Sequence, residues 1–178
     1  FEMIETAKKH MPEGSGIGFT TNGMLICEKT AEKIVESKLD KLVISVDGIK
    51  PETYGYIRSG GSFKKIKKGI DILNSIKEKT GKKTPKLGIE FVVMKRNLEE
   101  LPLVVEFAKE NSIEFIIVSH LLPYTEEMTG QTLFELLSEA SIEIFEKALK
   151  HAKNQGVNLK NYYNFSFFRN KKSVSDFY

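Results

Sequence analysis

The strongest constraint on the fold is a regular alternation of short apolar runs with longer segments of helical periodicity. The apolar runs predict four strands, at about residues 17–20, 42–46, 87–94 and 115–118. The periodic segments predict helices at about residues 1–11, 31–39, 63–80, 98–108 and 138–154. Strands that alternate with helices form parallel sheets through crossover connections, so the sequence predicts an α/β fold of parallel βα repeats. Periodicity alone leaves open whether the sheet closes into a barrel or stays open.

The length of the chain allows one domain with a substantial core. We assign residues 1–156 to this domain and residues 157–178 to a tail that packs on the sheet or leads to a further domain. The tail is rich in aromatic residues, which are Tyr162, Tyr163, Phe165, Phe167, Phe168, Phe177 and Tyr178. Because an exposed aromatic surface of this size would be adhesive, we expect residues 162–168 to cover one end of the sheet.

Composition argues against several classes of protein. No apolar run approaches the roughly 20 residues that a membrane span needs, and the first residues lack the basic segment of a signal peptide. The single cysteine, Cys27, excludes an internal disulfide and fits a cytoplasmic protein, and we expect it to be a small buried hydrophobe. The chain opens with Phe1 instead of methionine, which we interpret as a cut inside a longer protein.

The net charge of +3 comes almost entirely from lysine. The lysine-rich segment 64–86 lacks the arginines and interleaved aromatic residues that usually read nucleic acid. We therefore interpret these lysines as a solvated helix face, and we expect neither a nucleic-acid partner nor a membrane partner.

Two other kinds of site are disfavoured by spacing. The three histidines, His10, His120 and His151, have no partner at i, i+4 and no cysteine nearby, so a protein metal site is not expected. Ser45 and His120 could be imagined as a nucleophile and its base. No Gly-x-Ser-x-Gly elbow surrounds Ser45, which argues against a hydrolase.

Polar side chains gather where the predicted strands end. They are Thr21 and Asn22 after the first strand, Ser45 and Asp47 after the second, Ser119 and His120 after the fourth, and Glu90 within the third. Because the carboxyl ends of parallel strands share one edge of the sheet, we expect these groups to line one rim. Asn22 and Asp47 each precede a glycine, so a turn explains them equally well. Ser45 and Glu90 interrupt apolar runs, which favours a functional role.

Two further patterns lie beside this rim. Arg58 could clamp a carboxylate or phosphate of a ligand, or it could pair with an acid of the chain and hold its loop. Asn97 with Glu100 three residues later resembles a capping box at the start of a helix.

Five strings in order carry a resemblance to a known family. They lie at residues 20–25 (TTNGML), 44–48 (ISVDG), 52–58 (ETYGYIR), 61–63 (GSF) and 91–100 (FVVMKRNLEE). Together they resemble the radical S-adenosylmethionine (SAM) superfamily, in its branch of molybdenum-cofactor synthesis and peptide- or cofactor-maturing enzymes. Residues 119–125 (SHLLPYT) are similar to maturases of tungsten-cofactor oxidoreductases. The resemblance covers about residues 1–125.

The resemblance implies an open, TIM-like (β/α)₆ barrel, of which this chain holds the third to sixth strands. In that family a Cys-x-x-x-Cys-x-x-Cys loop binds a [4Fe–4S] cluster, and SAM is cleaved to a 5′-deoxyadenosyl radical. The radical then acts on a substrate such as a peptide or a cofactor precursor. Carried over by position, the SAM-binding residues are Thr21, Asn22, Ser45, Asp47 and Glu90. The residues implied to face the substrate are Arg58, Ser119 and His120.

The sequence departs from the family pattern at one decisive point, because the three clustered cysteines are missing. We therefore expect the parent to be a radical SAM oxidoreductase and this chain alone to be inactive, with neither SAM nor the cluster bound firmly. The unpaired edge of the first strand could support a dimer. Two alternatives remain open: a non-catalytic binding or scaffold module, and an unrelated α/β enzyme whose strand ends mimic the motifs. The residues do not identify a substrate.

Overall fold

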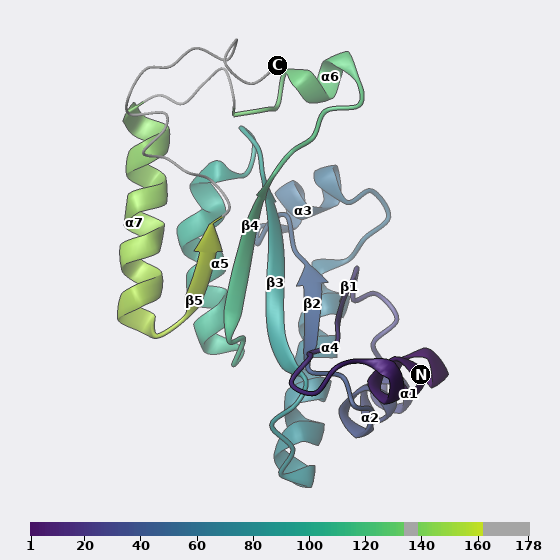
Figure 1. The fold of residues 1–178 in the computed structure, drawn as a ribbon. Coiled ribbons are helices and arrows are strands. Elements are labelled where there is room, and N and C mark those ends of the chain that lie inside the picture. Colours follow the sequence, from purple (N-terminus) through teal and green to yellow (C-terminus); the bar gives the residue numbers. More distant parts are fainter. Residues whose placement is uncertain (134–138, 162–178) are drawn as a thin grey trace.

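The computed structural model describes residues 1–133 and 139–161, which fold around one parallel sheet. Its five strands lie in the order in which they occur in the chain (Figure 1). They are β1 (Gly18–Thr21), β2 (Lys41–Ser45), β3 (Lys86–Val93), β4 (Phe115–His120) and β5 (Asn158–Asn161). Each neighbouring pair is parallel, as the alternation of strands and helices predicted.

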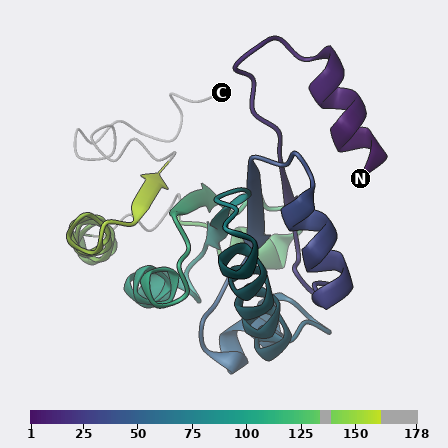
Figure 2. The ribbon, with the colours of Figure 1, turned by 90° about the horizontal axis from the view of Figure 1, so that it is seen from below.

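The helices connect the strands in the sense expected of βα repeats. They are α1 (Glu2–His10), α2 (Glu28–Glu36), α3 (Pro51–Ile57), α4 (Phe63–Thr80), α5 (Leu101–Glu110), α6 (Glu126–Thr129) and α7 (Glu139–Gln155), with a 3₁₀ turn, η1 (Leu98–Glu100). Viewed from below, α2, α4, α5 and α7 form an arc on one side of the sheet (Figure 2). The chain thus folds as part of an open, TIM-like barrel, which confirms the predicted fold class.

The two faces of the sheet differ because register places alternate side chains on opposite sides. Register partners Leu42 and Leu87, like Ile44 and Ile89, point toward the helices and are at most 1% exposed. Burial of each such side chain contributes about 1.5–3 kcal/mol. The residues between them, such as Val43 and Ser45, point to the other face, which the arc of helices leaves open. We call this second side the open face.

The sequence pattern predicted four strands and did not reveal a fifth. β5 lies within residues 157–178, which were assigned to the tail, and it pairs with β4 from Phe115↔Asn158 to Val118↔Asn161. Its sequence, Asn-Leu-Lys-Asn, is too short and polar to show a strand pattern. The aromatic residues expected to cover the sheet, from Tyr162 onward, lie outside the described residues.

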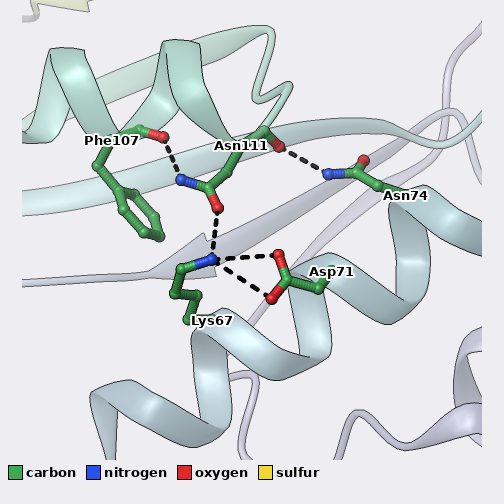
Figure 3. A network of polar contacts seen from close by, with 5 residues as sticks. All are labelled: Lys67, Asp71, Asn74, Phe107 and Asn111. Atoms are coloured by element: carbon green, nitrogen blue, oxygen red, sulfur yellow. Dashed lines mark hydrogen bonds and ion pairs between the residues drawn. The ribbon is translucent and has the colours of Figure 1, made fainter.

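A polar network ties α4 to the end of α5 on the helix side (Figure 3). The Asn111 side chain donates to the Phe107 carbonyl at 2.7 Å and accepts from Lys67 Nζ at 3.2 Å. Asn74 donates to the backbone carbonyl of Asn111 at 2.7 Å. Asn111 caps the end of α5, so the bond from Asn74 satisfies a carbonyl that the helix end would leave without a partner, and the Phe107 carbonyl accepts from both the amide and the side chain of Asn111.

Two features near the amino terminus complete the fold. Asp40 accepts from Lys8 Nζ and from the Ile17 amide, both at 2.6 Å, and these contacts lower the pKa of its carboxyl group. They fasten α1 and the segment before β1 to the start of β2. Cys27 was expected to be buried but is exposed, because it stands at the first turn of α2, where its amide donates to Thr30 Oγ1 at 2.8 Å.

Within residues 1–133 and 139–161, every helix is too short or too polar to cross a bilayer.

Candidate functional site

The register of the sheet brings two of the predicted site residues side by side. Ser45, the last residue of β2, is the register partner of Glu90 in β3. Both point to the open face, where Ser45 is 8% exposed and Glu90 is partly exposed. Ser119 of β4 pairs with Val92, so it points to the same face one step further along. A hydroxyl and a carboxylate therefore meet near the carboxyl end of the sheet, as the strand-end pattern predicted.

Asp47 and Arg58 form a partly buried ion pair beside these residues. Asp47 Oδ2 accepts from Arg58 Nε and Nη2, each at 2.6 Å, and Asp47 Oδ1 accepts from the Val92 amide at 2.9 Å. The Asp47 side chain is 4% exposed and that of Arg58 is 32% exposed. Of the two roles left open for Arg58, the structure shows the pairing with an acid, and the remaining N–H groups of its guanidinium stay available.

Asn97 and Glu100 join the loop after β2 to the end of β3. Asn97, fully buried, donates from Nδ2 to the carbonyls of Asp47 at 3.0 Å and Val92 at 2.9 Å. Its Oδ1 accepts from the Met94 amide at 2.8 Å. Glu100, 3% exposed, accepts from the amides of Ile49 at 2.7 Å and Lys50 at 3.0 Å.

The predicted capping box is therefore wrong. Neither η1 nor α5 has a side-chain cap, because both side chains reach across 50 residues of sequence to the loop after β2. Asn97 and Glu100, whose spacing resembled a local motif, instead make long-range hydrogen bonds that fix the backbone around Asp47.

The remaining predicted residues lie at the edge of this arrangement. Thr21 pairs with Ile44 and so points toward the helices, where its hydroxyl accepts from the Gly23 amide at 3.2 Å. Asn22 is exposed and its Oδ1 accepts from the Met24 amide at 3.1 Å, which is the turn role left open for it. Thr20, not singled out from the sequence, is the β1 residue that points to the open face, as the register partner of Val43.

His120 also points away from the open face. It pairs with Val93, whose side chain belongs to the core, while Ser119 lies on the other side of the strand. Burial lowers the pKa of His120 to about 4, so the imidazole is neutral at pH 7.

A cavity of about 380 Å³ opens beside the rim, between the strand ends, α3 and α6. Asp47 and Arg58 lie in its wall together with Val92, Met94 and Leu121. Tyr56 lines it too, with its hydroxyl 3.4 Å from Glu127 Oε1 and the Arg96 guanidinium 3.7 Å above its ring. The cavity thus combines apolar walls with the Arg58 guanidinium, the carboxylates of Asp47 and Glu127, and the Gln131 amide. Sequence reasoning missed Tyr56, Met94 and Leu121, since none stands out by residue type or spacing.

The residues of the chain do not fit an iron–sulfur cluster. Cys27 is its single cysteine, and it lies at the start of α2. Among the described residues no three His, Cys, Asp or Glu side chains come together as a metal site. Three thiolates are needed to hold such a cluster while leaving one iron open, so this part of the sheet does not carry one.

The rim suits part of SAM better. Hydroxyl and carboxylate side chains on the open face match ribose hydroxyls and an ammonium group, which donate hydrogen bonds to them.

Comparisons with known proteins point to one family. A sequence model of the radical SAM superfamily matches residues 1–108. The chain is 29% identical over 138 residues to a tungsten-containing aldehyde ferredoxin oxidoreductase cofactor-modifying protein of Pyrococcus furiosus, covering 75% of this chain and 37% of the relative. It is 30% identical over 149 residues to a probable GTP 3′,8-cyclase of Methanocaldococcus jannaschii, covering 84% of this chain and 46% of the relative. The chain therefore spans less than half the length of either.

The solved structures agree on the fold. SuiB of Streptococcus suis bound to S-adenosylmethionine superposes with a TM-score of 0.61 at 22% identity, over 81% of this chain and 32% of SuiB.

Proposed function

This chain belongs to the radical SAM superfamily, and we propose that it forms the later strands of the barrel of an enzyme that reductively cleaves SAM. The 5′-deoxyadenosyl radical released by that cleavage would act on a peptide or on a cofactor precursor. The chain would contribute contacts to SAM and substrate. The thiolates that hold the [4Fe–4S] cluster would come from residues outside these 178, because the chain has one cysteine.

One observation carries this proposal, which is the pairing of Ser45 with Glu90 on the open face. The Ser45 hydroxyl would bind a ribose hydroxyl or the carboxylate of SAM, and Glu90 would accept hydrogen bonds from its ammonium group or from the substrate. Ser119, on the same face, would approach adenine or the substrate. Thr21, Asn22 and His120 were implied to face SAM or substrate as well, but their placement gives this less support.

Asp47 and Arg58 would position the site. Both carboxylate oxygens of Asp47 are engaged by Arg58 and the Val92 amide, so Asp47 would hold the loop after Ser45 and would not bind SAM directly. The remaining guanidinium N–H groups of Arg58 border the cavity beside the rim and would meet an anionic group of the substrate.

The substrate class rests on the relatives. One is named as a cofactor-modifying protein, and SuiB is known in complex with the precursor peptide SuiA. We carry this to the present chain as a peptide or cofactor precursor. The division into a barrel portion, residues 1–156, and a tail, residues 157–178, belongs to the same proposal, with β5 at the start of the tail joining the sheet of the barrel portion.

The full-length protein gives the test. The gene should encode three cysteines spaced Cys-x-x-x-Cys-x-x-Cys before Phe1. In that protein, Ser45→Ala and Glu90→Gln should each raise the KM for SAM about tenfold or more, which corresponds to one lost hydrogen bond to a charged or polar group. The readout is 5′-deoxyadenosine formed with dithionite as reductant. Ser75→Ala, on the exposed side of α4, is the matched control and should leave KM unchanged.

A non-catalytic module is the second candidate, and the single cysteine favours it. A gene that starts near Phe1 would support the module and overturn the enzyme. Titration of the 178-residue chain with SAM adds an independent measure. If the chain is part of a radical SAM enzyme, it should bind SAM weakly or undetectably on its own, because it lacks the iron that anchors SAM.

A further inference from the structure

Seven lysines line two cavities at the amino end of the sheet, opposite the rim, and six remain when Lys77, which pairs with Glu114, is set aside. These six are Lys41, Lys82, Lys83, Lys86, Lys109 and Lys160, and we call them the amino-end lysine cluster. They line two cavities, of about 760 Å³ and about 340 Å³, that share Lys86 and Glu114. The cluster therefore covers one extended hollow surface.

Three of these lysines share the open face of the sheet. Lys41 and Lys86 are direct register partners at the first positions of β2 and β3. Lys160 in β5 pairs with Ile117, which is itself the partner of Glu90, so it points to the same side. Like charges at paired positions of neighbouring strands destabilise a sheet. The arrangement costs the fold stability, and a bound anion would remove that cost.

Three acids lie near the cluster, of which Glu78 lines the larger cavity and leaves the lysines in clear excess, while the other two have partners outside the cluster. Glu114 pairs with Lys77 at 3.4 Å, and Asp40 holds Lys8 and the Ile17 amide. In the part of the chain that the structure describes, no ion pair joins any lysine of the cluster to an acid. Their charge is left for a partner.

The floor of the surface is apolar. Val43, Phe115 and Ile117 line the smaller cavity, and Ile113 and Val157 line the larger one. The Phe115 ring lies over Gly88, where an added Cβ would come within 2.3 Å of it. A ligand for this surface would combine negative charge with apolar groups.

The form of the surface favours a polypeptide over a small phosphate compound. The cationic side chains of both cavities are lysines, with none of the arginine forks that hold phosphate by paired hydrogen bonds. Spread, flexible ammonium groups suit several separate carboxylates.

We propose that the amino-end lysine cluster docks an acidic polypeptide segment with apolar residues between its Asp and Glu. The site is separate from the rim, at the opposite end of the sheet, so it stands independently of the proposed SAM chemistry.

The probe for this proposal is a fluorescein-labelled peptide of alternating Glu and Leu residues, followed by fluorescence anisotropy with the 178-residue chain. Saturable binding that weakens with added NaCl is expected. Lys41→Gln/Lys86→Gln/Lys160→Gln should weaken it about tenfold or more, as the loss of several partly exposed charge pairs implies. Lys29→Gln/Lys33→Gln/Lys68→Gln, with the same change in charge on α2 and α4, should stay within about twofold of the unmodified chain.

Several results would overturn the proposal. They are no binding of the peptide, equal loss in both triple variants, and undiminished binding of a peptide with Gln in place of Glu. Displacement by tripolyphosphate or by single-stranded DNA at lower concentration than by unlabelled peptide would assign the surface to those ligands instead. Circular dichroism checks that the triple variant is folded. Lys82→Gln/Lys83→Gln, in the loop after α4, repeats the test without touching a strand.

Discussion

Ser45 and Asp47 stand two residues apart at the carboxyl end of β2, yet their contacts differ. Asp47 is enclosed by Arg58 and the Val92 amide, whereas Ser45 faces its neighbour Glu90 on the open face. Both were predicted as SAM-binding residues from their position. Only the contacts separate a residue that holds the backbone from one that can meet a ligand.

The ion pair leads to a prediction for Asp47→Asn. The substitution removes the charge that faces Arg58, so we expect the free energy of unfolding to fall by about 2 kcal/mol, below the 3–5 kcal/mol of a fully buried pair because Arg58 is one-third exposed. Urea denaturation measures the change. Glu143→Gln, which breaks the exposed pair with Lys147, is the control and should cost at most about 0.5 kcal/mol. Equal losses in the two variants would contradict the assigned role.

His120 predicts a dependence of stability on pH. Its pKa is about 4 in the folded chain and about 6.5 when unfolded, so below pH 6.5 the unfolded state binds the proton more readily. The contribution of the neutral His120 imidazole to the free energy of unfolding is present above pH 6.5 and is lost as the pH falls toward 4. Because His120 is only partly buried, we expect a loss of about 1 kcal/mol. Urea denaturation of His120→Gln should show a smaller decrease from pH 7 to pH 4.5 than the unmodified chain, and parallel curves would refute the assignment.

At the scale of elements, β3 is the strand on which the others are aligned. Gly88 leaves room for the Phe115 ring of β4, and two residues later Glu90 meets Ser45 of β2. Asn97 and Glu100, just beyond β3, hold the loop that follows β2. The close packing at one end of β3 and the hydrogen bonds of Asn97 and Glu100 at the other fix the register of β3 with β2 and β4.

Gly88→Ala tests this packing. The new methyl group would lie 2.3 Å from two ring atoms of Phe115, so the ring or the strand must shift, at a cost of about 1–3 kcal/mol. A smaller side chain in Phe115→Leu should recover part of that loss in the double variant, as a double-mutant cycle in urea would show. Gly55→Ala, in α3 with nothing within 4 Å of the new methyl group, is the control and should stabilise by about 0.5–1 kcal/mol. If the losses in unfolding free energy of Gly88→Ala and Phe115→Leu simply add in the double variant, the contact between the two residues is refuted.

At the scale of the whole molecule, the sheet formed by the described residues has two edges, β1 and β5. In β1 the Ile17 carbonyl accepts from the Lys41 amide, so Phe19 and Thr21 bond toward β2 while the backbone of Gly18 and Thr20 points outward. Three of the four β1 residues are exposed and the fourth is partly so. Such an edge is a template for another strand.

Self-association through β1 is therefore expected at high protein concentration. Thr20→Pro removes an N–H that points away from β2, which leaves the sheet intact and blocks pairing at the edge. Light scattering coupled to size-exclusion chromatography should show a concentration-dependent dimer for the unmodified chain and less of it for the variant. Lys153→Gln, at the end of α7, is a control that should not alter the dimer. A dimer that persists in Thr20→Pro would place the interface elsewhere.

The order of strands and helices, the parallel sheet and the polar rim followed from the sequence, because apolar periodicity and strand-end chemistry are local properties of the chain. The short polar strand β5 and the exposure of Cys27 could not be predicted in this way. Nor could the roles of Asn97 and Glu100, whose bonds span about 50 residues of sequence. The same holds for the side of the strand on which Thr21 and His120 lie, since a shift of one residue in register reverses every side chain. Local pattern thus determined the fold and the family, and only tertiary contacts decided which polar residues serve structure and which remain available for a ligand.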